Sequence, residues 1–281
     1  QAVRLAGRVS GDSTVAYAWA YSMAAESATG AIVPARAAWL RALLLERERV
    51  GNHLGDLGAL GNDAALAAGL AQFSRLRELW LRCNDEVFGH RLLMDCIVPG
   101  GTRIEPDAGQ FERLHRQCSE LAAEVMTLRT IYEEHPGLQD RFVSTGVVTP
   151  ELAAQLGLRG LAGRASGQVR DLRVDLRCVP YDQLDGRIAS DGRGDVAARV
   201  AVRFDELFES MRLIDSILQR LPQGEVISPL PAVAHNGALG VGWVEGWRGD
   251  VMVAIEVDAN GLLRRCHCHA PSWQNWPVLE H

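Results

Sequence analysis

The sequence lacks the signatures of several large protein classes. No apolar run approaches the ~20 residues needed to span a bilayer, and no segment has the pattern of a signal peptide. It contains neither a Gly-x-Gly-x-x-Gly motif after a strand nor a Walker-type loop, so the two common phosphate-binding loops are excluded. A formal charge of −6 and the absence of a basic stripe argue against a nucleic-acid-binding protein.

Cysteine is sparse, and no two cysteines form a Cys-x-x-Cys pair. Several of them occupy apolar positions of predicted helices, which favours reduced thiols in a cytoplasmic setting over a disulfide framework. The six are Cys83, Cys96, Cys118, Cys178, Cys266 and Cys268.

The two ends of the sequence do not resemble natural termini. Gln1 leads directly into structured-looking sequence, and Leu279-Glu280-His281 is either native or the remnant of an expression tag. We therefore expect the 281 residues to be part of a longer protein, so that further motifs lie outside them.

Four segments repeat apolar residues at steps of three and four, the spacing of one face of a helix. This spacing predicts long helices packed against one another. Pro34 suits a first helical turn, whereas Pro136 and Pro222 close the third and fourth helices. The helices are expected at residues 34–57, 66–87, 111–132 and 196–221.

The remaining segments have a different character. Residues 142–194 are rich in glycine and arginine, with a helix start at Thr149-Pro150-Glu151. Between Gly157 and Arg173, arginine recurs four times among glycines, which fits either a solvated connection or a docking loop for an acidic or redox partner. These arginines are Arg159, Arg164, Arg170 and Arg173.

Short β-type runs at residues 241–245, 251–257 and 262–266 surround a hairpin signal at 258–261. The predicted fold class is therefore mainly α, a bundle of long helices with a small antiparallel β subdomain near the C-terminus. We expect one integrated domain: a helical core over residues 1–221, with the irregular connection at about 142–194, and a β region over residues 222–281.

The stretch RVSGDST at residues 8–14 places two serines three residues apart where a helix is about to begin. Nickel and low-valent iron in redox enzymes favour thiolates, which a Cys-x-x-Cys pair at a helix start supplies. A serine hydroxyl is a hard ligand that is not ionised at neutral pH. Ser10 or Ser13 would instead suit the N-cap of the following helix.

RVSGDS resembles the Arg-Val-Cys-Gly-x-Cys motif of nickel–iron hydrogenase large subunits, with serine at both cysteine positions. The similarity extends without a gap through the first helical segments, and it reappears in later blocks. The pattern is similar to the energy-converting, membrane-bound branch of hydrogenases, such as formate hydrogenlyase, and to the 49 kDa-type quinone-side subunit of respiratory complex I. The matching blocks are residues 20–26, 30, 33–37, 43–58, 88–91, 98–101, 194–196, 245–250, 265–266 and 270–273.

The sequence departs from both branches at the motif itself. Ser10 and Ser13 stand at positions where the resemblance implies nickel-ligand cysteines, and Tyr17 stands at that of a histidine. Gly11 stands at the position of the tyrosine that binds the quinone head group in complex I. The second cysteine pair is expected beyond Trp276, and the partner histidine of the quinone site before Gln1. We therefore predict no catalytic, cofactor-binding or metal-ligand residue here.

Other polar groups admit structural explanations. Cys266-His267-Cys268-His269 could bind zinc, but alternation along a strand would place the cysteines on one face and the histidines on the other. His53 and His90 are expected to be buried and hydrogen-bonded rather than catalytic. The charge run at residues 46–49 is expected to be a solvated helix face with short-range ion pairs.

The resemblance implies an electron-transfer subunit in the peripheral arm of a cytoplasmic, inner-membrane-associated complex. It would lie beside an iron–sulfur subunit and above the membrane subunits, with nickel–iron or quinone as the family's cofactor and nicotinamide chemistry in another subunit. Hydrogenase activity is not expected. Two alternatives remain open: a non-catalytic scaffold that holds the iron–sulfur partner, and a zinc-binding module at residues 266–269.

Overall fold

The computed structural model describes residues 1–176, 178–232 and 237–281. It confirms the predicted fold class, with long helices followed by a three-stranded antiparallel sheet near the C-terminus. The long helices are α2 (Thr14–Thr29), α3 (Ala35–Asp63), α4 (Ala67–Phe88), α5 (Ala108–Glu134) and α10 (Val196–Arg220). The shorter elements are α1 (Ala2–Ala6), β1 (Ile97–Val98), β2 (Gly101–Thr102), α6 (Pro136–Phe142), α7 (Pro150–Leu156), α8 (Gly160–Arg164), α9 (Leu172–Asp175), η1 (Tyr181–Gln183), α11 (Ser272–Asn275) and η2 (Trp276–Glu280).

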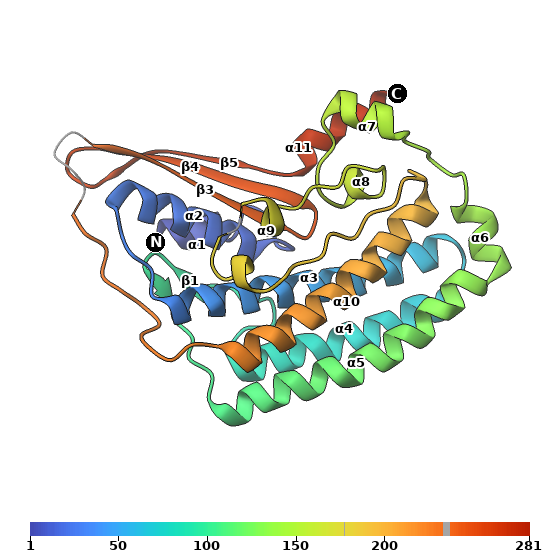
Figure 1. Cartoon of the computed structure of the whole chain (residues 1–281), viewed down its shortest axis with the longest axis horizontal. Helices are drawn as coiled ribbons and strands as arrows, with labels where there is room; N and C mark the ends of the chain where they lie inside the picture. Colours follow the sequence, from blue (N-terminus) through green and yellow to red (C-terminus); the bar gives the residue numbers. More distant parts are fainter. Residues whose placement is uncertain (177, 233–236) are drawn as a thin grey trace.

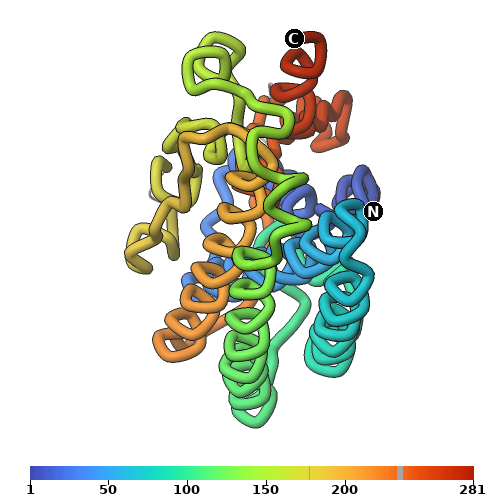
Figure 2. Tube along the Cα trace, turned by 90° about the vertical axis from the view of Figure 1, so that its right-hand side faces the viewer, coloured from blue at the N-terminus to red at the C-terminus, as the bar shows by residue number. Residues whose placement is uncertain are grey.

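Helix α3 is the centre of the molecule. It contacts α2 on one side and α4 and α10 on the other, and α5 contacts both α4 and α10 (Figure 1). Seen from the side, α10, α5 and α4 stand next to one another below the rest of the chain (Figure 2). Because neighbours surround α3, it is buried around most of its circumference, and its apolar stripe is fully inaccessible. That stripe consists of Leu40, Leu43, Leu44, Val50, Leu54 and Leu57.

Several helices begin at a residue whose side chain accepts a backbone N–H group of the first turn. Asp107 and Gln110 form a capping box at the start of α5, each side chain accepting the other's backbone N–H at 2.8 Å. Thr149 accepts the N–H of Leu152 at the start of α7, as predicted. Asp195 caps α10 by accepting the N–H of Ala198 at 2.8 Å, which fixes where this helix begins.

The sheet consists of β3 (Ala238–Gly246), β4 (Gly249–Val257) and β5 (Leu263–His269), in that order and antiparallel. Figure 1 shows it lying over α2, which separates it from α3. The face toward α2 is apolar on β4, where alternate residues are buried: Val251, Val253, Ile255 and Val257.

Helix α2 packs so closely on β3 that the two backbones are in contact. A Cβ added at Gly240 would lie 1.9 Å from the carbonyl oxygen of Ala24, and one at Gly242 would lie 1.9 Å from that of Ala20. Only glycine fits beneath the helix at these positions, and the helix presents small residues there in turn. The sheet therefore fixes the position of α2 and of the loop that precedes it.

The glycine- and arginine-rich segment was predicted to be either a solvated connection or a surface docking loop. Both predictions are wrong for two of its arginines. Arg164 at the end of α8 and Arg173 in α9 are buried, whereas Arg170 between them is exposed. The segment folds inward because the two buried guanidinium groups find carboxylate partners beneath it.

Candidate functional site

The loop that enters α2 is held by its own side chains. Ser13 is the N-cap residue and is buried, yet its hydroxyl makes no capping hydrogen bond among the described residues. It donates instead to Oδ1 of Asp12 at 3.3 Å, and the hydroxyl of Ser10 donates to the same oxygen. Ser13 thus occupies the N-cap position as predicted, but neither serine caps the helix with its hydroxyl.

A carboxylate from α3 caps the helix in their place. Oε2 of Glu48 accepts the N–H of Val15 at 2.6 Å, and Oε1 accepts the N–H of Ala16 at 3.2 Å. The amide of Asn52 donates to the carbonyl oxygen of Asp12 at 2.6 Å, which ties the loop to α3 a second time. Burial raises the pKa of Glu48 to about 8, although the two N–H groups act in the opposite direction.

On its outer side, the loop is closed by an arginine from the turn between β3 and β4. Arg248 forms an ion pair with Asp12, and its guanidinium carbon lies 4.5 Å from the centre of the Trp247 ring. Burial alone would raise the pKa of Asp12, but the hydrogen bond from Ser10 and the charge of Arg248 lower it. The ionised Asp12 carboxylate thus binds both serine hydroxyls and the arginine of the turn between β3 and β4.

The residues of this loop do not fit the cofactors that the resemblance implies. Ser10 and Ser13 offer hydroxyls already bonded to a carboxylate, which are poor ligands for a metal that prefers thiolates. Gly11 is exposed and has no side chain with which to bind a quinone oxygen. Tyr17 is buried one turn into α2, and burial raises the pKa of its phenol to about 12, with a smaller contribution from Cys268.

Beneath the loop, the charge run of α3 enters the protein interior, and the prediction of a solvated face is wrong. Glu46, Arg47 and Arg49 are completely inaccessible, and Glu48 is 8% exposed. Because an unpaired buried charge is costly, each needs polar partners from other elements.

Glu46 is surrounded by donors. Arg173 approaches its carboxylate at 3.0 Å, and the hydroxyls of Tyr181 and Ser210 each donate to it at 2.6 Å. Arg49 lies 3.4 Å away on the same helix. These contacts join α3 to α9, η1 and α10.

A second cluster forms around Arg164. Its Nε donates to Glu206 and its Nη1 to Glu245, both at 2.7 Å, and Asp171 lies at 3.6 Å. Nε2 of His53 lies 3.0 Å from the other oxygen of Glu206. The prediction that His53 is buried and hydrogen-bonded is confirmed. The two clusters form one buried charge network, defined here as Glu46, Arg49, His53, Arg164, Asp171, Arg173, Glu206 and Glu245.

The carboxylates of this network have different proton affinities. Burial alone would raise the pKa of Glu206, but the charge of Arg164 and the hydrogen bond to His53 hold it well below its usual range. Burial lowers the pKa of His53 despite that carboxylate, which keeps its imidazole neutral at pH 7. Burial and the nearby Asp171 raise the pKa of Glu245 to about 7.

His90 is only half-buried, in the loop after α4, and its Nδ1 accepts the N–H groups of Leu92 and Met94 at 3.1 and 3.4 Å. It is hydrogen-bonded as expected, but more exposed than predicted.

The strand β5 divides Cys266-His267-Cys268-His269 as alternation predicts. The sulfurs of Cys266 and Cys268 are 3.9 Å apart, while the rings of His267 and His269 lie 6.0 and 5.0 Å from that of Trp273. In the described ranges, no cluster of three or more histidine, cysteine or acidic side chains could hold a metal ion. The zinc-binding alternative therefore gains no support.

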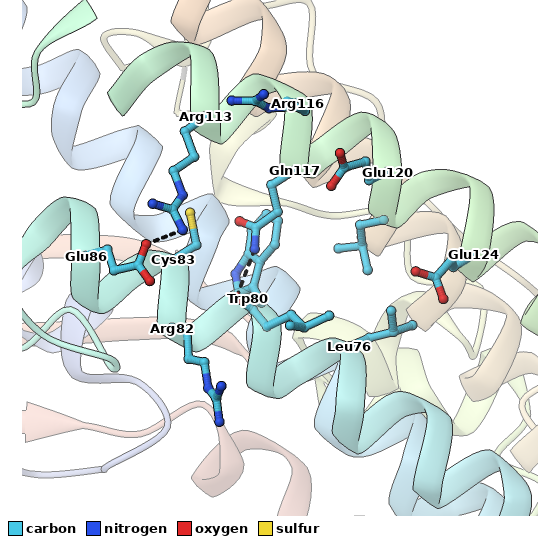
Figure 3. Close-up of a pocket in the computed structure, with 12 residues that line it drawn as sticks. Leu76, Trp80, Arg82, Cys83, Glu86, Arg113, Arg116, Gln117, Glu120 and Glu124 are labelled. Carbon is cyan, nitrogen blue, oxygen red and sulfur yellow. Dashed lines mark hydrogen bonds and ion pairs between the residues drawn. The ribbon is translucent and has the colours of Figure 1, made fainter. Parts of the chain in front are cut away.

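A groove of about 410 Å³ lies between α4 and α5, away from the loop. Figure 3 shows Arg113 and Gln117 of α5 reaching toward Trp80, Cys83 and Glu86 of α4, with an ion pair between Arg113 and Glu86. Beneath it, the guanidinium carbon of the buried Arg47 lies 3.8 Å from the centre of the Trp80 ring. Its rim carries charges of both signs, so it has no net preference for a charged partner.

Comparison with known proteins identifies relatives of the whole chain. The family described as "Respiratory-chain NADH dehydrogenase, 49 Kd subunit" matches residues 63–239. Formate hydrogenlyase subunit 5 of Escherichia coli (strain K12) is 32% identical over 278 residues, covering 99% of this chain and 48% of that protein. An NADH-quinone oxidoreductase subunit of Rhizobium etli (strain ATCC 51251) is 30% identical over 215 residues, covering 76% of this chain and 53% of that protein.

The chain thus spans about half the length of these two curated relatives. Among solved structures, a chain from the membrane-bound sulfane sulfur reductase, an archaeal respiratory membrane complex, matches with a TM-score of 0.91 and 26% identity. That match covers 99% of this chain and 77% of the other. This chain therefore shares its arrangement of helices and sheet with a chain of that respiratory membrane complex.

Proposed function

Because the chain belongs to the family of the 49 Kd subunit of respiratory-chain NADH dehydrogenase, we propose that it is the electron-transfer subunit of a membrane oxidoreductase of the hydrogenase and complex I type. The names of its relatives support this proposal, since they include a formate hydrogenlyase subunit and an NADH-quinone oxidoreductase subunit. In the described ranges, no helix combines the length and the apolar character that a membrane crossing requires.

The partners follow from the same proposal. An iron–sulfur subunit would lie against this chain, and membrane subunits would anchor both, with the chain in the peripheral arm on the cytoplasmic side. The chain itself would hold neither nickel nor quinone through the loop at residues 10–13, and it would not turn over hydrogen.

The observation that carries the expected absence of nickel and of hydrogen turnover is the chemistry of that loop. Both hydroxyls are committed to Asp12, and Asp12 is paired with Arg248. A thiolate-preferring metal would meet two neutral hydroxyl groups and one carboxylate already in an ion pair. We expect the purified complex to contain no nickel bound by this subunit and to show no hydrogen-dependent dye reduction. Stoichiometric nickel that disappears in the Ser10→Ala, Ser13→Ala double variant would overturn the proposal.

A second candidate function is a scaffold that only holds the iron–sulfur partner. It is favoured by the way the loop is tied down, since the Asp12 carboxylate pairs with Arg248 and the Asp12 carbonyl oxygen accepts the amide of Asn52. The variant Asp12→Ala separates the two functions, with Asp191→Ala as the control because Asp191 pairs locally with Arg193. A lower electron-transfer rate per assembled complex favours the electron-transfer subunit. Loss of assembly with an unchanged rate in the remaining complex favours the scaffold.

A further inference from the structure

The end of the hairpin formed by β3 and β4 brings two acidic side chains together. Glu245 on β3 and Asp250 on β4 are directly opposite one another in the ladder, close to the turn at Trp247 and Arg248. Opposed residues of antiparallel strands project from the same face, with their Cβ atoms about 4.5–5.5 Å apart. The two carboxyl groups lie within hydrogen-bond reach of each other. Like charges in this position repel, so the pair resists double ionisation.

Both carboxyl groups are buried, so water screens this repulsion poorly. Glu245 is 2% exposed and Asp250 is 8% exposed. Helices α8 and α9 lie against this end of the hairpin (Figure 1). The N–H of Leu172, the first residue of α9, donates to Oε2 of Glu245 at 3.1 Å. In such surroundings two neighbouring carboxylates repel more strongly than in water, which favours retention of one proton between them.

The charges around the pair differ by one when every acid is ionised. The buried charge network and Asp250 together contain five carboxyl groups. Four guanidinium groups oppose them, three within the network and that of Arg159 beside Asp250. Because His53 is neutral, one negative charge is in excess, and one bound proton removes it. The carboxyl groups belong to Glu46, Asp171, Glu206, Glu245 and Asp250, and the guanidinium groups to Arg49, Arg159, Arg164 and Arg173.

Glu245 shares its main positive partner with another acid. Arg164 donates both to Glu245 and to Glu206 of α10, in each case at 2.7 Å. Arg49 of α3 also favours the ionised form of Glu245, whereas Asp171, next to α9, opposes it. Burial and the charge of Asp171 together raise the pKa of Glu245 to about 7. Glu245 is therefore the member of the pair that holds a proton more readily.

Asp250 is placed to accept a hydrogen bond from that proton. Burial raises the pKa of Asp250, whereas the hydrogen bond with Glu245 lowers it. The charges of Arg159 and Arg164 also favour ionised Asp250, and that of Asp171 opposes it. A protonated Glu245 that donates to an ionised Asp250 satisfies both groups.

We propose that Glu245 and Asp250 form a proton-binding pair that shares a single proton at neutral pH. The O–H of one carboxyl group donates to the carboxylate of the other, and the two arginines beside them balance the remaining negative charge. Asp250 keeps a small accessible surface, through which the pair exchanges its proton with solvent. The pair thus binds or releases one proton between the sheet and the buried charge network.

The test follows the carboxyl infrared band of the full-length subunit in its purified complex between pH 5 and pH 9. Protonated carboxyl groups have a C=O band that carboxylates lack. The double variant Glu245→Gln, Asp250→Asn supplies the reference spectrum, in which the other acids, including Glu48, are subtracted. We expect the wild type to show the band of one carboxyl group at pH 6. In Glu245→Gln and in Asp250→Asn, the midpoint of its loss should move down by at least about one pH unit, a tenfold lower proton affinity.

Two further variants separate the loss of an acid from damage to the hairpin. Asp250→Glu keeps two acids in the pair, so its midpoint should stay near that of the wild type. Glu209→Gln is the matched control, because Glu209 is equally buried but pairs with Arg212 on its own helix. A wild-type spectrum without the band at pH 6 would overturn the proposal. So would an unchanged midpoint in either single amide variant, which would show that one acid binds the proton alone, or equal shifts in Asp250→Asn and Asp250→Glu.

Discussion

At the start of α2, the carboxyl group of Glu48 occupies the place that a local serine or threonine takes at many helix N-termini. It accepts the N–H groups of Val15 and Ala16 from another helix, 33 and 32 residues away in sequence. The positive end of the helix dipole favours a negative group there, whereas complete burial favours the neutral acid. Burial prevails, and the pKa of Glu48 rises to about 8.

This raised pKa predicts a pH-dependent stability. In the folded chain, Glu48 keeps its proton up to about pH 8, while in the unfolded chain it loses it near its ordinary value of 4.5. Its contribution to the free energy of unfolding is therefore full below about pH 4.5, and it is lost as the pH rises toward about 8. Glu48→Gln removes this dependence. Between pH 5 and pH 8, we expect the wild type to lose at least about 1.4 kcal/mol relative to the variant, the equivalent of one pKa unit.

The measurement is urea unfolding of both proteins at the two pH values. Parallel changes in the free energy of unfolding would show that Glu48 titrates alike in the folded and unfolded chains.

The role of Glu48 could not be predicted from the sequence. The loop at residues 8–14 contains two serines at good capping positions, and local hydrogen bonding is the usual outcome for such residues. Both hydroxyls turn to Asp12 instead, because Arg248, 236 residues away, fixes that carboxylate. What the sequence did predict is the helix that follows.

At the scale of elements, the position of α2 depends on the absence of side chains beneath it. Helix α2 lies directly on the backbone of β3 at Gly240 and Gly242. The alternation of residues 241–245 predicted a strand, but it did not predict that two glycines would face a helix. A glycine in a strand indicates a bulge, a bend or a close approach equally well.

Gly242→Ala tests this close approach. Its methyl group would lie 1.9 Å from the carbonyl oxygen of Ala20, so α2 and the sheet must separate. We expect the free energy of unfolding to fall by more than the ~1–3 kcal/mol of ordinary overpacking. Val241→Ala on the same strand is the control, because Val241 is exposed and should cost far less. Comparable losses in thermal unfolding for the two variants would contradict the contact.

At the scale of the whole molecule, the buried charge network joins α3, α8, α9, α10 and β3. Each apolar stripe of the long helices was readable from its spacing, because neighbours in the helix lie three and four residues apart. The network was not readable, because its pairs between elements join distant residues, 42 positions apart for Arg164–Glu206 and 127 for Arg173–Glu46. A charged run on a helix has the same local pattern whether water or distant side chains surround it.

The chain contains no lysine, so all 29 of its basic residues are arginines. The planar guanidinium can bind several carboxylates in fixed directions, as Arg164 does with Glu206 and Glu245. Arg164→Ala leaves these carboxylates buried without a counterion, and we expect it to cost about 3–5 kcal/mol of the free energy of unfolding.

The control for that variant is Arg170→Ala in the same segment, where the side chain is exposed and the expected change is within about 0.5 kcal/mol. Chemical unfolding curves of the two variants provide the measurement. A loss below about 1 kcal/mol for Arg164→Ala would mean that the network relaxes or admits water.

The contact between α2 and the glycines of β3 affects which substitutions the loop before α2 tolerates during evolution. Because the helix is seated on the backbone of β3, its position does not depend on which residues occupy positions 10, 11 and 13. Single substitutions at these positions can therefore change the side chains of the loop without changing the packing of α2 on β3.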